Sequence, residues 1–489
     1  MIANHNCWTC KERKVGCDRF LPECVNCKRS GRHCQGYALK LAWPDKVDGR
    51  RKQKKYQAQH VRSTDYLTRN GRFTFLNTTN EDFNDTIDFQ RIVKIESYSR
   101  DEYQIRPALR PLSNINEEDG RLLSYFDSVL ARMITTIDDN TNGFRLKLIP
   151  MALSSTDASS KSLLQAISAL SSFHLGRSEE ALQHKVKAIK SLSKSFQEGP
   201  SAMLTQFATC MMLCVYSVFD PSDTTWHTHL RGAKIIAEAL GKRERDMLCW
   251  DFLELWLDYH ETFSTYSYPA DLSFNDGEPN IVLPESNDHN RQIIGPHGCS
   301  TEVLKIISCI NQLRTLKSSS KQSPESKTQT FLELSLLIRS RLQTLSQEIR
   351  LEIGETSGTL DQTRILLTAD FYRIATHLYL YQIAPPQAIP PNAVKELVKE
   401  GWSVLDQMEV CTSPWPLFIL ACNVGTDVER WKIMAMLEVM EERRGVGNYL
   451  LVRGLIQAVW MRADLGDRVV EVIDWRELVR EGEGMPSFI

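Results

Sequence analysis

From Asn116 onward, apolar residues recur at the three- and four-residue spacing of a helix face. The first run follows Asn116-Glu-Glu-Asp119, which has the pattern of a helix N-terminal capping box. Three runs share this period: Leu122, Leu123, Phe126, Val129, Leu130 and Met133, then Leu163, Leu164, Ile167 and Leu170, then Leu182, Val186, Ile189 and Phe196. Strand-like alternation is scarce. The pattern predicts a large all-α domain over residues 116–489.

The same periodicity predicts further helices along this domain. They cover residues 226–240, 244–266, 301–316, 330–351, 360–384, 393–411, 427–442, 447–463 and 468–480. Loops are indicated by the Pro/Gly-rich stretch 269–298, by the serines and lysines of 318–327, and by the prolines from Pro385 to Pro391.

The longest apolar stretch is Met203–Phe219, which is interrupted by four polar residues. It is shorter than the roughly 20 apolar residues that a membrane-spanning helix needs. We therefore expect a buried core helix here and no membrane partner.

Six cysteines near the N-terminus follow a repeated spacing. They are Cys7, Cys10, Cys17, Cys24, Cys27 and Cys34, which form two copies of Cys-x2-Cys-x6-Cys. A Cys-x2-Cys pair can offer two thiolates to one tetrahedral zinc. Two separate tetrahedral zinc ions need eight ligands, so six sulfurs suffice only if two are shared. In a repeat of this symmetry the natural bridging pair is Cys7 and Cys24.

These cysteines admit two other interpretations. A disulfide framework requires an oxidising compartment, and Met1–Asn6 shows no secretory signal. His5 and His33 would complete eight ligands for two unshared zinc ions, as in ring-type or LIM-type modules. However, His33 adjoins Cys34, and neighbouring residues rarely bind one metal well. The shared-thiolate cluster is therefore favoured.

Charge is unevenly distributed along the 489 residues. Residues 1–62 hold fifteen Lys/Arg and five Asp/Glu, a net charge of +10. The whole chain has a net charge of −2, so residues 63–489 carry −12. This asymmetry indicates a polyanionic partner for the N-terminal part alone. That part is too small for an apolar core, as expected for a fold nucleated by metal.

Residues 39–115 are predicted to form a linker that is first basic and then polar. Its basic run is Arg50, Arg51, Lys52, Lys54 and Lys55. Such a run is typical of a nuclear localisation signal or a phosphate-contacting arm, or it is simply a solvated linker. No apolar heptad occurs within residues 56–110, so no coiled coil is evident. Homodimerisation through the helical domain stays open.

The stretch CWTCKERKVGCDRFLPECVNCKRSGRHC resembles the fungal binuclear zinc cluster family of transcription factors. The resemblance implies a DNA-binding module over residues 1–38, built from two short helix-plus-extended units around two Zn²⁺ bridged by two thiolates. It also implies nuclear localisation and double-stranded DNA as partner. Four segments downstream resemble that family's helical regulatory domain, namely 143–153, 226–240, 295–313 and 370–386. This second resemblance implies possible co-regulator proteins as partners.

The resemblance also assigns roles to basic residues. Residues 13 and 14 would reach the base edges of a CGG triplet, and the forked guanidinium of Arg13 suits guanine. Lys14 is the second candidate for a base contact. Phosphate contacts are expected from Lys11, Arg19, Lys28, Arg29 and Arg32. Gly16 departs from the family, which usually carries Lys or Arg before the third cysteine. Pro22 matches a central-loop proline that is often cis in the family.

No catalytic motif is found, and we expect no enzyme. The pair His227 and His229 would point to different sides of a helix, whereas Cys210 and Cys214 would share a face as core residues. The favoured function is sequence-specific, zinc-dependent regulation of RNA polymerase II transcription. Two alternatives remain: a zinc-dependent protein-interaction module without DNA specificity, and a helical domain that is an enzyme or metabolite sensor.

Overall fold

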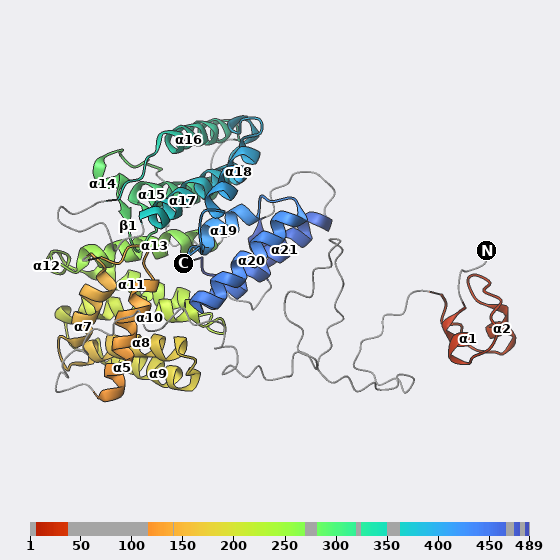
Figure 1. Ribbon diagram of the computed structural model, residues 1–489, viewed down its shortest axis with the longest axis horizontal. Coiled ribbons are helices and arrows are strands. Elements are labelled where there is room, and N and C mark those ends of the chain that lie inside the picture. The colour runs from red at the N-terminus through yellow and green to blue at the C-terminus, as the bar shows by residue number, and fades with distance from the viewer. Residues whose placement is uncertain are drawn as a thin grey trace. The chain divides into compact units, whose positions relative to one another are not determined.

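The computed structural model describes residues 6–37, 116–139, 141–268, 281–318, 324–349, 362–465, 474–479 and 485–488. The chain divides into two units, Met1–Glu102 and Tyr103–Ile489 (Figure 1). The predicted linker lies outside the described residues, as does most of the predicted helix 468–480.

The N-terminal unit contains two one-turn helices, α1 (Trp8–Glu12) and α2 (Val25–Arg29). Each begins directly after a cysteine, and the two halves correspond at an offset of 17 residues. The amide of Trp8 donates to the carbonyl of Gly36 at 3.1 Å, which ties the end of the second half to the start of the first. The unit therefore has the two helix-plus-extended halves that the sequence predicted.

The helical unit begins with a group of helices around α8, α9 and α10. The elements of this part are α5 (Glu117–Tyr125), η3 (Phe126–Leu130), α6 (Ala131–Met133), η4 (Phe144–Leu148), α7 (Ile149–Leu153), α8 (Ala158–His174), α9 (Ser178–Ser195), η5 (Pro200–Ala202), α10 (Met203–Phe219), α11 (Trp226–Ala239), α12 (Lys242–Arg245) and α13 (Trp250–Ser267). Helix α8 packs against α9, α10 and α5, and α10 packs against α11.

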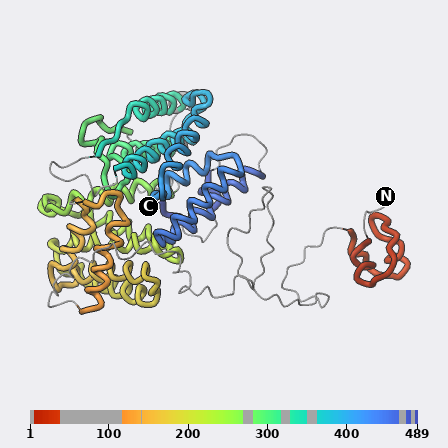
Figure 2. Tube along the Cα trace, in the orientation of Figure 1, coloured from red at the N-terminus to blue at the C-terminus, as the bar shows by residue number. Residues whose placement is uncertain are grey.

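The second part of the helical unit contains the remaining elements. They are α14 (Asp288–Arg291), β1 (Ile293–Ile294), β2 (Cys299–Ser300), α15 (Thr301–Ser318), α16 (Pro324–Thr344), α17 (Gln362–Ile383), η7 (Pro386–Ala388), α18 (Ala393–Leu405), α19 (Pro414–Ala421), α20 (Asp427–Arg444), α21 (Asn448–Leu465) and η8 (Trp475–Leu478). Helix α13 contacts α10 and α11 on one side and α15 on the other, and so joins the two parts (Figure 2). Strands β1 and β2 form a small antiparallel hairpin with Ile293 opposite Ser300.

The apolar stretch predicted as a core helix is α10. Every residue from Gln206 to Phe219 is buried. The stretch Pro200–Phe219 has the length and composition of a membrane span, but most of it lies inside the helical unit. The prediction of a buried core helix is therefore confirmed.

The apolar residues whose period predicts the helix α9 do not form its buried face. Leu182, Val186, Ile189 and Phe196 are 40–56% exposed. The buried face of α9 instead carries Ala181, His184, Ala188, Leu192 and Ser195. Small side chains allow α9 to approach α8 closely, and the His184 Nδ1 lies 2.8 Å from the Gln165 Oε1 on α8. The large apolar residues at helical spacing therefore lie on the solvent side of α9, because its close packing against α8 uses small and polar residues.

The other helices agree with the prediction in type and differ in extent. The segment 244–266 is two helices, because a turn separates α12 from α13. The capping box at Asn116 is only half formed. The Asn116 side chain accepts from the Asp119 amide at 2.7 Å. The Asp119 carboxylate, however, accepts from the Asn116 side chain and not from the Asn116 backbone amide. Helix α19 was not predicted, and it contains Pro414 and Pro416. They are tolerated in its first turn, where backbone amides need no intrahelical partner.

The reversed orientation of α9 can be tested by two substitutions on neighbouring faces. Ala188→Leu places a larger side chain against α8 at a position with no exposed surface, and should lower the free energy of unfolding by about 1–3 kcal/mol. Leu182→Ala, at a position that is 56% exposed, should change it by less than about 0.5 kcal/mol. Denaturant unfolding of the full chain measures both, and the opposite ranking would show that Leu182, and not Ala188, lies on the packed face of α9.

Candidate metal centre and nucleic-acid interface

The six N-terminal cysteine sulfurs lie together between α1 and α2. Two sets of four have all their sulfurs within 4.8 Å of one another. One set is Cys7, Cys10, Cys17 and Cys24, and the other is Cys7, Cys24, Cys27 and Cys34. Only Cys7 and Cys24 belong to both sets. Six sulfurs therefore offer two four-ligand sites through one shared pair, which is the pair that repeat symmetry indicated.

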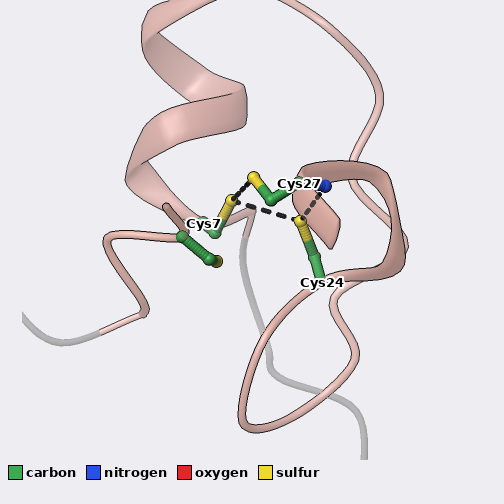
Figure 3. A group of neighbouring side chains, drawn as sticks. Cys7, Cys24 and Cys27 are labelled. Atoms are coloured by element: carbon green, nitrogen blue, oxygen red, sulfur yellow. Dashed lines mark hydrogen bonds between the residues drawn. The ribbon is translucent and has the colours of Figure 1, made fainter. Parts of the chain in front are cut away.

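The distances between the sulfurs fit tetrahedral zinc. The Cys7 Sγ lies 3.6 Å from the Cys24 Sγ and 3.8 Å from the Cys27 Sγ (Figure 3). The Cys10 Sγ lies 3.7 Å from the Cys24 Sγ. Zinc–sulfur bonds of about 2.3 Å in a tetrahedron separate the sulfurs by about 3.8 Å. These separations also far exceed a disulfide bond of about 2.05 Å.

Backbone hydrogen bonds hold the sulfurs in place in both halves. Cys7 and Cys24 are the N-caps of α1 and α2, and their sulfurs accept from the amides of Cys10 and Cys27 at 3.4 and 3.3 Å. Cys17 accepts from the amide of Cys7 at 3.4 Å. In each helix one first-turn amide, that of Cys10 or Cys27, thus donates to a ligand sulfur, which stabilises negative charge at the helix N-terminus.

The surroundings of the thiols differ in their effect on ionisation. Burial raises the pKa of the Cys24 thiol to about 12 and also raises that of Cys7. Burial also disfavours the Cys17 thiolate, but the amides of Cys7 and Arg19 outweigh it and lower the pKa to about 7. Zinc favours the thiolate form of every ligand that it binds, so metal binding should release protons.

The alternative with histidine ligands is not favoured by this geometry. His33 belongs to neither set of four, and its carbonyl accepts from the Thr9 hydroxyl at 3.1 Å. That hydroxyl also accepts from the Gln35 amide at 3.0 Å. Thr9 therefore links the two halves beside the cluster. His5 lies outside the described residues.

Three residues that the sequence analysis did not single out support the module. The Asp18 carboxylate accepts from the amides of Val25 and Asn26 at 2.9 and 3.0 Å, and these amides lower its pKa. The Asn26 side chain donates to the carbonyl of Gly16 at 2.6 Å. The Ser30 hydroxyl lies 3.4 Å from the Arg13 Nη1. An acidic residue six positions before Cys24 is the only sequence signal for this capping of α2.

All the predicted DNA-contacting side chains are exposed at the surface of the module; they are Lys11, Arg13, Lys14, Arg19, Lys28 and Arg29, together with Arg32. Helix α1 ends at Glu12, so Lys11 lies within it, Arg13 is its C-cap and Lys14 follows it. The Lys11 Nζ lies 4.5 Å from the centre of the Trp8 ring, a cation–π contact.

Two of these basic residues have a backbone conformation that favours glycine. Lys14 and Arg19 have φ angles of 56° and 58°. Their counterparts at the 17-residue offset are Gly31 and Gly36, with φ angles of 61° and 71°. A side chain in this left-handed region costs about 1 kcal/mol or more per residue. The first half thus has lysine and arginine at two turns where the second half has glycine, which adopts this conformation without strain.

Two further sequence observations concern the loop after α1. A Cβ atom added at Gly16 would meet no heavy atom within 4 Å, so a larger residue fits there. The Leu21–Pro22 peptide bond is cis.

The residues weighed for other chemistry lie in the helical unit. Burial lowers the pKa of His229 to about 4, and its Nε2 lies 3.4 Å from the Thr225 hydroxyl. His227 is exposed. Cys210 and Cys214 are buried in α10 with free thiols, and burial raises the pKa of both. Their positions fit packing rather than catalysis.

Comparison with known proteins places both units in families. Residues 5–44 match the fungal Zn(2)-Cys(6) binuclear cluster domain, and residues 121–488 match the fungal specific transcription factor domain. With the sulfur geometry above, the first match identifies the cofactor as two Zn²⁺ in a binuclear cluster. No solved structure matches the chain.

Three curated relatives are similar to this chain. Transcription factor iacI of Pestalotiopsis fici is 24% identical over 74% of this chain and 92% of its own length. An uncharacterized transcriptional regulatory protein of Schizosaccharomyces pombe is 21% identical over 98% of this chain and 95% of its own. Arginine metabolism regulation protein II of Saccharomyces cerevisiae is 51% identical over 37 residues, which are 8% of this chain and 4% of that protein. Since the second domain alone spans more than half of the sequence, the chain belongs to the family of fungal specific transcription factors, with an N-terminal Zn(2)-Cys(6) cluster that binds DNA.

Proposed function

We propose that this protein is a sequence-specific, zinc-dependent regulator of RNA polymerase II transcription that acts in the nucleus and reads CGG-type elements in the major groove. Residues 1–38 form the DNA-binding module, residues 39–115 the linker, and residues 116–489 the regulatory domain. Within the module, Cys10 and Cys17 complete one zinc site and Cys27 and Cys34 the other, while Cys7 and Cys24 bridge both ions.

The observation that carries this proposal is the exposed basic surface built on the cysteine cluster. Residues 6–37 hold seven Lys/Arg and three Asp/Glu, a net charge of +4. One of the three acids, Asp18, is already engaged with the amides of α2. A small, positively charged module with its basic side chains directed to solvent suits a polyanion.

Within this surface, Arg13 and Lys14 are our candidates for base contacts. The Arg13 guanidinium has one weak contact with Ser30 and otherwise faces solvent, so its two-pronged edge can donate to guanine O6 and N7. Lys14 keeps a left-handed backbone at a position where glycine is easier, which supports a role for its side chain. Lys11, Arg19, Lys28, Arg29 and Arg32 are our candidates for phosphate contacts. Neutralising about six phosphates gives a salt slope near −5.

Selection of random DNA duplexes by the full, zinc-loaded chain tests this function directly. We expect enrichment of CGG triplets, because an arginine fork discriminates guanine by roughly 1–3 kcal/mol. A chelator should abolish the enrichment, because the module has no other core to hold α1 and α2 together. Arg13→Ala should lose the enrichment and retain two zinc ions, measured by metal analysis. Zinc binding without any enriched sequence would favour a protein-interaction module instead.

The role of Lys14 can be separated from its strained backbone by two substitutions. Lys14→Ala removes the basic side chain and leaves the strain of the left-handed conformation, whereas Lys14→Gly removes both the side chain and the strain. We expect both variants to bind the selected duplex about tenfold more weakly. Lys14→Gly should hold zinc against a competing chelator at least as well as Lys14→Ala, since glycine adopts positive φ freely. Unchanged DNA affinity in both variants would exclude the proposed base contact.

Gly16 offers a gain-of-binding test. Because a side chain at this position meets open space, Gly16→Lys should add a phosphate contact without disturbing the cluster. DNA affinity should rise, and the slope of log K against log salt should steepen by about 0.9. Gly16→Ala is the matched control, which should leave both quantities unchanged. A steeper slope in neither variant would show that DNA does not pass near this loop.

A further inference from the structure

Helix α9 carries a line of large apolar side chains on its solvent side, which we call the α9 seam. It consists of Leu182, Val186, Ile189 and Phe196, which are 40–56% exposed. With the exposed Ser193, these positions alternate in steps of four and three residues, which is the spacing of a coiled-coil interface. At 1.5 Å per residue the α9 seam is about 21 Å long.

The α9 seam has little cover in the helical unit. Within the part of the chain that the structure describes, α9 packs chiefly against α8 and also contacts α10, and it lies at the edge of the unit (Figure 1). Single exposed apolar residues are ordinary on a protein surface. Four of them in one line, at the spacing by which helices pack together, indicate a contact surface instead.

The surface beside the α9 seam is basic. Residues 183–197 hold four lysines and no Asp or Glu. Three of the lysines are exposed on one side of the seam and form what we call the lysine flank: Lys187, Lys190 and Lys194. None of the three makes an ion pair with a described residue, whereas Lys185, on the other side of the seam, pairs with Asp223. Free positive charge therefore borders the seam along one edge only.

This combination of an apolar line and a basic edge suits an amphipathic helix with acidic residues. A helix laid along α9 places its apolar side chains between those of the seam, and its flanking side chains meet the lysines. Two heptads are too short for a free-standing coiled coil. However, α9 is already folded and held by α8, so only the incoming helix has to be ordered.

A second copy of this chain is a poorer occupant. In an isologous contact the same patch lies on both sides. Antiparallel pairing of two α9 helices brings Lys190 of each copy toward Lys190 of the other, and parallel pairing brings it toward Lys185. Like charges meet in both cases, whereas acidic residues neutralise the lysine flank.

A lipid surface is also a poorer occupant. An interfacial helix buries a broad apolar face in the bilayer. On α9 the exposed apolar residues form one narrow line, and the neighbouring Ala181, Ala188 and Leu192 are already buried in the helical unit.

We propose that the α9 seam binds an amphipathic helix of a partner protein, with acidic residues of that helix against the lysine flank. The apolar residues supply most of the affinity, while the charges fix the orientation of the helix and exclude basic partners. The contact involves only the helical unit. It therefore goes beyond the reading of DNA proposed for the zinc module and does not depend on it.

Binding of designed peptides to the full, zinc-loaded chain, measured by fluorescence anisotropy at physiological salt, tests the proposal. The probe is a peptide of about three heptads with leucine at a and d and glutamate at e and g. One control peptide has lysine in place of glutamate, and another has glutamine in place of leucine. We expect the probe to bind about tenfold more tightly than either. The glutamine peptide measures simple attraction to the basic zinc module, so equal binding of this peptide and the probe overturns the proposal.

Substitutions in the α9 seam locate the binding site. The double variant Leu182→Gln, Ile189→Gln should bind the probe about tenfold more weakly, because it removes two apolar contacts. Ile235→Gln is the control, at a position that is 57% exposed on α11, which packs against α10 and α13. It should bind the probe normally. Unchanged affinity in the double variant overturns the proposal, and melting curves report whether each variant folds.

Reversal of the lysine flank separates docking from a loss of structure. The triple variant Lys187→Glu, Lys190→Glu, Lys194→Glu should bind the lysine peptide about tenfold more tightly than the unsubstituted chain does. It should bind the glutamate probe no better than the glutamine peptide. Lys399→Glu, at an exposed position of α18, is the control and should leave both affinities unchanged. A triple variant that still prefers the glutamate probe overturns the proposal.

The two other occupants give distinct results. Sedimentation velocity of the chain alone would detect a dimer that Ile189→Gln dissolves, which would assign the seam to a second copy. Cosedimentation with vesicles of phosphatidylcholine and phosphatidylserine, lost in the same variant, would assign it to a lipid surface. Either result overturns the proposal.

Discussion

The sharing of two sulfurs between two four-ligand sites is the constraint on which the N-terminal module depends. The buried apolar residues of this described unit are cysteines, with Tyr37 packed beside them. Such a segment has too little apolar surface to offset the entropy of ordering its chain. The cluster must therefore supply the core, and its two helices are positioned by the sulfurs that cap them. Exposed basic side chains follow from this, because the cysteines and Thr9 fill the interior of residues 6–37.

The chemistry of metal binding restricts the spacing of the cysteines more tightly than that of other residues in the chain. Six cysteines with equal intervals and two Cys-x2-Cys pairs leave few arrangements, so the shared pair Cys7 and Cys24 was predictable. The all-α class was also predictable, since apolar periodicity continues over hundreds of residues. The role of Asp18 in capping α2 was not predictable, because its partners are backbone amides that become adjacent only in the folded loop.

The orientation of α9 shows why periodicity alone can mislead. A helix period shows that one face is apolar, and it does not show which face has a neighbour. On α9 the neighbour is α8, and small residues such as Ala181 and Ala188 face it, while Leu182 and Ile189 remain in solvent.

The pairing of Lys14 with Gly31, and of Arg19 with Gly36, has a consequence for how such a module can change over time. At the two glycines any side chain adds strain, so the second half admits little variation there. At Lys14 and Arg19 the strain is already present, and replacement by glycine relieves it. Mutational drift should thus erode the basic positions of the first half more easily than it alters the second. Long-term retention of lysine and arginine at these two turns would then show that selection keeps these side chains, although the backbone conformation favours glycine.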